Sequence, residues 1–192
     1  MADVIDTSEF RNGLKILIDN EPFVIVEFQH VKPGKGSAFV RTRYKSLISG
    51  RVLEKNFKSG EKVGRPDIEE KKMQYLYKEG EHYVFMDSKN YEQSHIDEKG
   101  LGDSKNFLKE NMDASVLFWN GRAISVDLPN AVELRVKKCD PGVRGDTVSG
   151  ALKPATLETG YTLNVPLFIN EGDLLKIDTR TGQYLDRAAR AG

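Results

Sequence analysis

A short glycine-rich segment, Lys32-Pro33-Gly34-Lys35-Gly36, combines residues that could present one cation to a charged surface. Glycine has no Cβ, so the residues on both sides of Lys35 can adopt positive φ angles and allow another surface to approach the backbone. Pro33 fixes its own φ angle and favours an extended Lys32. The segment therefore predicts a narrow projection with the Lys35 amine at its apex. An ordinary solvated turn would have the same pattern, so the surroundings must decide between the two interpretations.

Basic residues are concentrated around this segment. Between Gln29 and Lys58 the chain has eight lysines and arginines and one acidic residue, Glu54, whereas the other 162 residues hold 21 basic and 28 acidic residues. The formal net charge of the whole chain is zero. A basic arm on an acidic body attracts a polyanion to one place and disfavours it elsewhere, which favours a nucleic-acid partner.

Two strand-like runs flank the projection and must position it. Residues 22–31 and 38–44 are rich in β-branched and aromatic residues, and the segment between them carries proline and glycine. Such a pattern predicts a β-hairpin with the Lys35 segment as its loop.

The sequence contains none of the usual patterns of an enzyme active site. His30, His82 and His95 are not at metal-ligand spacings, and the chain has a single cysteine, Cys139, which we expect to be a half-buried strand residue. A nucleophile elbow, a P-loop and a dinucleotide fingerprint are all lacking. We therefore predict no catalytic residue, no cofactor and no bound metal.

The composition indicates a soluble protein of the cytoplasm. The chain of 192 residues is 39% hydrophobic and 30% charged, with no apolar run near the length of a membrane span. Its acidic first residues do not resemble a signal peptide, and one cysteine suits a reducing compartment. We expect no membrane partner.

Strand and turn signals divide the chain into three small all-β domains, with expected bounds 1–65, 66–128 and 129–192. Several short strands at this spacing suggest small barrels. Asn120-Gly121 lies between apolar runs and is a strong hairpin signal. We expect one short helix over Phe107–Asn111, which with five strands would make an OB-fold.

Two motifs far apart in the sequence resemble those of bacterial translation elongation factor P. The first is the Lys35 segment followed by Ala38-Phe39. The second is similar to the C-terminal signature of that family, and its residues are Lys153-Pro154-Ala155, Gly160, Leu163, Val165-Pro166, Ile169 and Gly172. The resemblance covers essentially the full length.

The resemblance implies an SH3-like (KOW-type) N-terminal barrel followed by two OB-folds, with an L shape like that of tRNA. It also implies a factor that binds both ribosomal subunits between the P and E sites. Such a factor positions the P-site peptidyl-tRNA, stimulates peptide-bond formation and relieves stalling at consecutive prolines. It is a ribosome cofactor and not an enzyme, and we expect it to act as a monomer.

The resemblance also implies roles for individual residues. Lys35 matches a tip lysine that is extended by a lysine-modifying enzyme in many bacteria. Residues expected to contact the P-site tRNA or ribosomal RNA are Lys32, Gly34, Lys35, Gly36, Arg41, Arg43, Tyr184 and Arg187. Gly145, Asp146 and Thr147 match a loop that approaches the E-site codon.

Three other interpretations remain open at this point. A bacterial paralogue of elongation factor P is one alternative, although the intact Lys32-Pro33-Gly34-Lys35-Gly36 tip favours the main factor. The archaeal and eukaryotic initiation factor five-A also has a modified tip lysine, but it lacks a third domain. A generic OB-fold RNA-binding protein needs a basic groove lined with aromatic residues, whereas here the OB-like segments carry the acidic excess.

Overall fold

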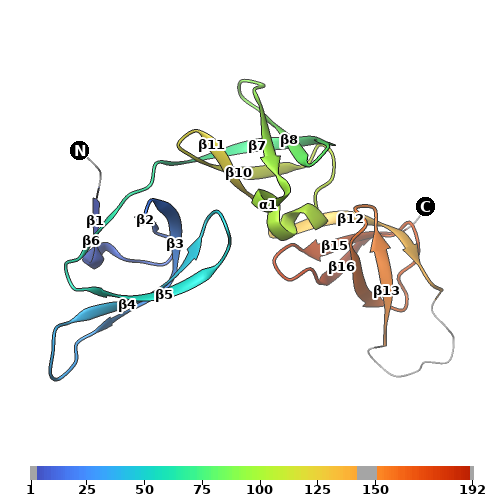
Figure 1. Ribbon diagram of the computed structural model, residues 1–192. Helices are drawn as coiled ribbons and strands as arrows, with labels where there is room; N and C mark the ends of the chain where they lie inside the picture. Colours follow the sequence, from blue (N-terminus) through green and yellow to red (C-terminus); the bar gives the residue numbers. More distant parts are fainter. Residues whose placement is uncertain (1–3, 142–150, 191–192) are drawn as a thin grey trace. The chain divides into compact units, whose positions relative to one another are not determined.

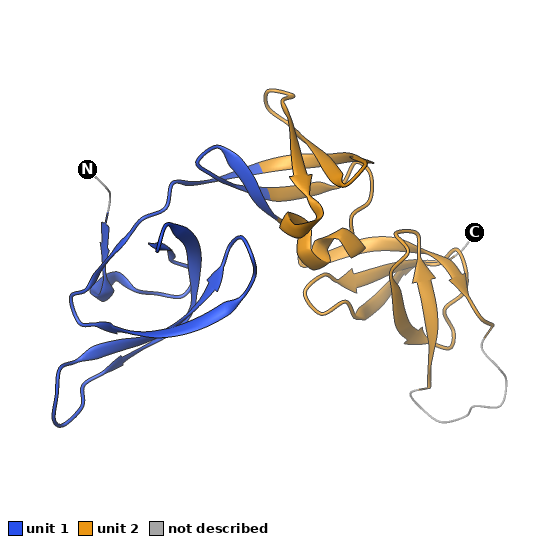
Figure 2. Cartoon of the chain, viewed as in Figure 1, with its two compact units in different colours: residues 1–71, 116–125 blue, residues 72–115, 126–192 orange. Residues whose placement is uncertain are grey.

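The computed structural model describes residues 4–141 and 151–190, and it is mostly β-structure arranged in three antiparallel sheets (Figure 1). This agrees with the all-β prediction. The chain forms two compact units, one of residues 1–71 and 116–125 and the other of residues 72–115 and 126–192 (Figure 2). Within the described ranges, no helix has the length and apolar character needed to cross a membrane.

The first sheet has six strands in the order β1-β6-β2-β3-β4-β5. These strands are β1 (Val4–Asp6), β2 (Lys15–Ile18), β3 (Glu21–Val31), β4 (Phe39–Ser46), β5 (Val52–Lys58) and β6 (Lys62–Gly64). A 3₁₀ turn, Thr7–Glu9, follows β1, and Asp6 caps it by accepting a hydrogen bond from the backbone N–H of Ser8 at 2.8 Å. The predicted hairpin is β3 and β4, which pair from Phe23 with Ser46 to Val31 with Phe39.

The second sheet has five strands in the order β11-β10-β7-β8-β9. They are β7 (Ile68–Glu79), β8 (His82–Asp87), β9 (Gln93–Asp97), β10 (Asp113–Trp119) and β11 (Arg122–Asp127). The predicted turn between β10 and β11 is present, with φ angles of +50° at Asn120 and +76° at Gly121. Positive φ at both central residues is what a type I′ hairpin turn requires.

The third sheet also has five strands, in the order β14-β13-β12-β15-β16. They are β12 (Ala131–Cys139), β13 (Leu152–Leu157), β14 (Thr162–Pro166), β15 (Leu174–Asp178) and β16 (Tyr184–Ala189). Cys139 is half-buried in a strand, as predicted. Pro154 lies inside β13 opposite Asn164, and the ladder to β12 stops at Ala155. Because Pro154 has no N–H to donate, it fits where β13 has a partner on one side only.

The helix expected over Phe107–Asn111 is wrong. The helical turns come earlier, as α1 (Glu98–Leu101) and a 3₁₀ turn (Gly102–Asn106). Asn111 has a φ angle of +66°, and its N–H donates to the Tyr75 carbonyl at 2.8 Å. Phe107 and the adjacent Leu108 are both buried. Tertiary burial and pairing with β7 therefore determine this segment, and a local helical preference does not.

The first and third sheets each pack around a cluster of buried apolar side chains. The first is formed by residues of β1 to β6 and by Phe10, with Phe10 and Phe57 edge to face at a centroid distance of 5.4 Å. The third-sheet cluster is formed by residues of β12 to β15 together with Ile169 and Phe107. Phe107 therefore belongs to the core of the third sheet, although in the sequence it lies between β9 and β10 of the second sheet.

Candidate functional site: a cationic hairpin tip

The tip of the β3–β4 hairpin is a fully exposed loop. The last residue pair of the ladder is Val31 and Phe39, and all of residues 32–37 are exposed. Among the described residues, the Lys32–Ser37 segment has no hydrogen bond or ion pair with the rest of the chain. The long β3–β4 ladder thus holds this loop out from the rest of the sheet (Figure 1). Within the described residues, the Lys35 amine has no hydrogen bond or ion pair.

The two tip glycines differ in what they require. Gly36 has a φ angle of +109°, which a residue with a Cβ rarely adopts. Gly34 has no such φ angle, and a Cβ added there would meet nothing within 4 Å. The conformation of the tip therefore explains a glycine at position 36, whereas neither backbone conformation nor space requires one at position 34.

Arg41 and Arg43 lie on one face of the hairpin. Their cross-strand partners on β3 are Gln29 and Glu27, respectively. Arg43 Nη1 donates to Glu27 Oε2 at 3.0 Å, with both side chains more than half exposed. Arg41 is exposed and has no ion pair within the described part of the chain. Of these two predicted contact residues, Arg41 is the one whose charge is not already paired.

A second cation of the basic segment is also engaged internally. Lys55 Nζ lies 4.6 Å from the centroid of the Phe57 ring and 3.4 Å from Glu61 Oε1. These two contacts give Lys55 a stabilising role within the first sheet. The sequence count of eight cations therefore overstates the charge that is free to meet a partner.

Tyr184 and Arg187, the other predicted contact residues, lie on strand β16 of the third sheet. Arg187 is mostly buried, with its guanidinium 5.1 Å from the Phe168 ring centroid and its Nη1 3.4 Å from Asp173 Oδ2. Burial raises the pKa of the Tyr184 hydroxyl above its usual range. Gly145, Asp146 and Thr147 lie outside the described residues.

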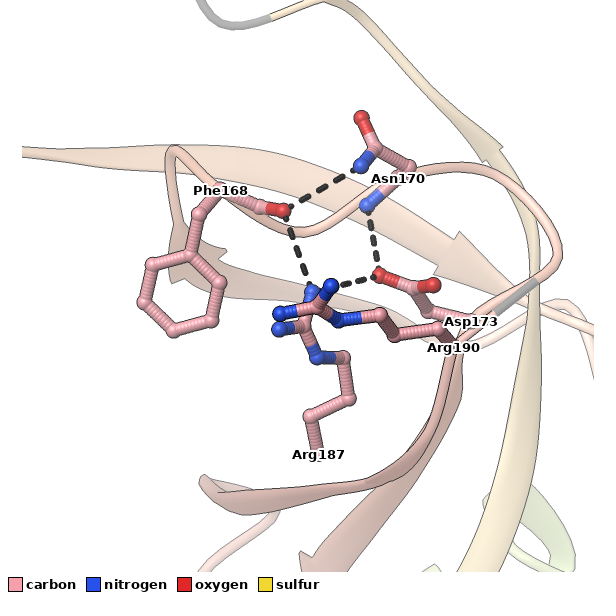
Figure 3. Close-up of a pocket in the computed structure, with 5 residues that line it drawn as sticks. All are labelled: Phe168, Asn170, Asp173, Arg187 and Arg190. Atoms are coloured by element: carbon pink, nitrogen blue, oxygen red, sulfur yellow. Dashed lines mark hydrogen bonds and ion pairs between the residues drawn. The ribbon is translucent and has the colours of Figure 1, made fainter.

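Arg187 lines a pocket of about 320 Å³ on the third sheet, and Figure 3 shows its lining residues. They are Phe168, Asn170, Asp173, Arg187 and Arg190. Sequence reasoning did not single out Arg190, which is exposed. The signal that could have found it is a second arginine three residues after Arg187 near the end of the last strand.

The described residues contain no cluster of three or more histidine, cysteine or acidic side chains that could hold a metal ion. The hairpin offers instead the exposed Lys35 amine, the exposed backbone of residues 32–37 and the Arg41 guanidinium, which has no ion pair among the described residues. Such groups bind phosphate oxygens and position them.

Two solved structures have a similar fold. An initiation factor 5A from Methanococcus jannaschii matches with a TM-score of 0.54 and 23% identity, covering 65% of this chain and 94% of that protein. An eIF-5A family protein from Naegleria fowleri matches with a TM-score of 0.52 and 15% identity, covering 66% of this chain and 99% of that protein. These two likenesses concern the fold of about two thirds of the chain.

Family comparisons are more specific. Residues 6–63 match the elongation factor P KOW-like domain, residues 68–126 its OB domain and residues 132–187 its C-terminal domain. Elongation factor P of Desulfitobacterium hafniense is 54% identical over 96% of this chain and 100% of that protein. The factor of Natranaerobius thermophilus is 55% identical over 96% and 98%. This chain belongs to the elongation factor P family of translation elongation factors.

Proposed function

We propose that this chain binds the ribosome between the P and E sites and stimulates peptide-bond formation at consecutive prolines. It does so by holding the acceptor end of the P-site peptidyl-tRNA with the tip of the β3–β4 hairpin. The observation that carries this proposal is the exposed, unengaged Lys35 on a projecting ladder, in a segment with eight basic residues and one acidic residue.

The physical basis is orientation. Proline reacts as a hindered secondary amine, and its fixed φ angle restricts the peptide that it joins. A poorly positioned peptidyl-tRNA therefore reacts slowly, and holding its end in place removes several kcal/mol of barrier, within the range known for intramolecular orientation. The chain needs only to bind and position, so a catalytic side chain is not required.

Lys35 is the residue that we propose as the target of a lysine-modifying enzyme. An added amine would extend its reach and its number of hydrogen-bond donors. Lys32, Gly34, Gly36 and Arg41 would contact tRNA or ribosomal RNA beside it, with Arg43 contributing after release from Glu27.

The remaining assignments follow the family. Tyr184 and Arg187 would face the P-site tRNA, and the loop with Gly145, Asp146 and Thr147 would face the E-site codon. We propose functional domains over residues 1–65, 66–128 and 129–192, and a monomer that acts in the cytoplasm.

The test is translation of a reporter with three consecutive prolines in a purified system. The wild-type protein, isolated from its native source with its intact mass measured, should rescue synthesis. Lys35→Ala should lower the rate of the stalled step roughly 10- to 100-fold, the loss expected for one or two charge-assisted hydrogen bonds. Lys89→Ala is a control, because Lys89 is exposed in the turn after β8.

Gly34→Ala sharpens the test. A Cβ at this position fits the free protein, so the variant should fold as the wild type does. If tRNA or ribosomal RNA approaches the tip backbone closely, the added methyl should still reduce rescue. No rescue by the native-source wild-type protein would reject the proposal and favour a generic RNA-binding role.

A further inference from the structure

Two aromatic rings lie at the base of the projecting hairpin. The rings of Phe28 and His30 meet edge to face, with centroids 5.7 Å apart and planes at 89°. Phe28 is half-buried and packs against the core cluster of the first sheet, whereas His30 is exposed. An exposed ring is thus held against an anchored one.

The pair lies on the face of the hairpin opposite to Arg41. His30 is the cross-strand partner of Val40, and Phe28 is the partner of Thr42, both of which are buried. Gln29, between the two rings in sequence, faces Arg41 instead. Because side chains alternate across a strand, the hairpin has an aromatic face and a cationic face.

His30 has no structural role that explains its exposure. Within residues 4–141 and 151–190 its imidazole makes no hydrogen bond or ion pair, and its ring contact with Phe28 is the interaction that the structure gives it. It lies two residues before Lys32 and five before Lys35 along the chain. An aromatic ring beside lysines is the combination that binds single-stranded nucleic acid, since the cations meet phosphates and the ring stacks on a base.

We propose that His30, supported by Phe28, stacks on an unpaired base at the single-stranded 3′ end of a tRNA. This inference rests on the proposed function, and it assigns to the tip a base contact in addition to its phosphate contacts. RNA is favoured over a protein partner because the surrounding segment is so strongly cationic.

The experiment measures binding of the full chain to two RNA hairpins at low salt. One carries an unpaired 3′ extension with a fluorescent purine analogue, and the other is blunt-ended. The wild type should prefer the extended hairpin and quench the analogue by stacking. His30→Ala should weaken binding to the extended hairpin roughly 5- to 100-fold, with quenching lost and binding to the blunt hairpin unchanged.

His30→Phe is the matched variant, because it keeps a ring and removes the imidazole nitrogens. It should retain both affinity and quenching. A thermal midpoint equal to that of the wild type will show that His30→Ala has left the barrel intact. Equal binding of the two hairpins by the wild type, or an equal loss for both hairpins in His30→Ala, would overturn the base contact.

The same variants separate this inference from the proposed function. If His30→Ala binds and quenches like the wild type while the native-source protein still rescues the three-proline reporter, the base contact is rejected and the proposed function stands. If stacking is observed but rescue is absent, the base contact stands and the elongation role is rejected.

Discussion

Arg187 Nη1 lies 3.4 Å from Asp173 Oδ2, and this ion pair is almost withdrawn from water, with 19% of the arginine side chain and 2% of the aspartate side chain exposed. Asp173 Oδ2 also accepts a hydrogen bond from the backbone N–H of Asn170 at 2.9 Å. Arg187 donates in addition to the Phe168 carbonyl at 3.5 Å. A residue assigned to tRNA contact is therefore also part of the internal structure of the third sheet.

Arg187→Ala should destabilise the protein, because it removes a partner from a buried carboxylate. The expected loss is about 3 kcal/mol in the free energy of unfolding, measured by denaturant titration. Arg190→Ala removes an exposed arginine of the same pocket and should change stability by about 0.5 kcal/mol or less. Equal stability of Arg187→Ala and wild type would show that the arginine is free for a ligand.

Asp178 makes the stability of the third sheet depend on pH in acid. Hydrogen bonds from the Arg180 side chain, with a further bond from its backbone N–H, lower the pKa of Asp178 from 3.8 to about 2. The unfolded chain then binds a proton that the folded chain does not, so stability falls as the pH drops from about 4 to about 2. In Asp178→Asn this part of the pH dependence should be missing from unfolding curves.

Arg180→Ala provides the control for this prediction. It leaves the carboxylate in place and removes the first cause of its lowered pKa. The difference in unfolding free energy between wild type and Arg180→Ala should shrink as the pH falls through this range. A difference that stays constant from pH 4 to pH 2 would contradict the assignment.

Gly182 carries both a conformational and a steric constraint. Its φ angle is +70°, and an added Cβ would collide with the Tyr161 hydroxyl and lie 3.6 Å from the Phe107 ring. Gly160 has a φ angle of +88°, but nothing lies within 4 Å of an added Cβ. Alanine should therefore cost about 1 kcal/mol at Gly160 and about 1–3 kcal/mol more at Gly182. Equal thermal midpoints of the two variants would show that Tyr161 moves aside without cost.

Phe107 ties the segment after α1 to the core of the third sheet. It is 2% exposed, and its ring centroid is 4.9 Å from that of Tyr161. Nearby, Thr159 Oγ1 donates to the Asn106 carbonyl at 2.7 Å, and Lys109 pairs with Glu158 at 3.3 Å. These residues all belong to the compact unit formed by residues 72–115 and 126–192.

Phe107→Ala should cost about 3–5 kcal/mol, because it empties a fully buried aromatic site. Hydrogen exchange should become faster in both the second-sheet and the third-sheet parts of this unit. Phe168→Ala is the control, since Phe168 is 56% exposed. Faster exchange confined to the strands of the third sheet would show that Phe107 does not couple the two parts.

Local chemistry accounts for the features that the sequence predicted. Asn120-Gly121 specified a hairpin because few other residue pairs accept two positive φ angles, and the β3–β4 hairpin follows from β-rich runs around a proline–glycine loop. The three-sheet architecture and the exposed Lys35 follow from such short-range preferences. The residues of each family motif likewise lie close together in the sequence, so the motifs can be read without knowledge of the packing.

Only the tertiary structure decided which residues far apart in sequence share a core or a charge. Phe107 joins the third-sheet core instead of a helix, Asp173 engages Arg187, and Glu27 engages Arg43. It also placed the His30 ring and the Arg41 guanidinium on opposite faces of one hairpin, in a register that depends on the bulge near Ile25. Packing and strand register depend on the whole folded chain, so residue types and spacing alone leave them undetermined.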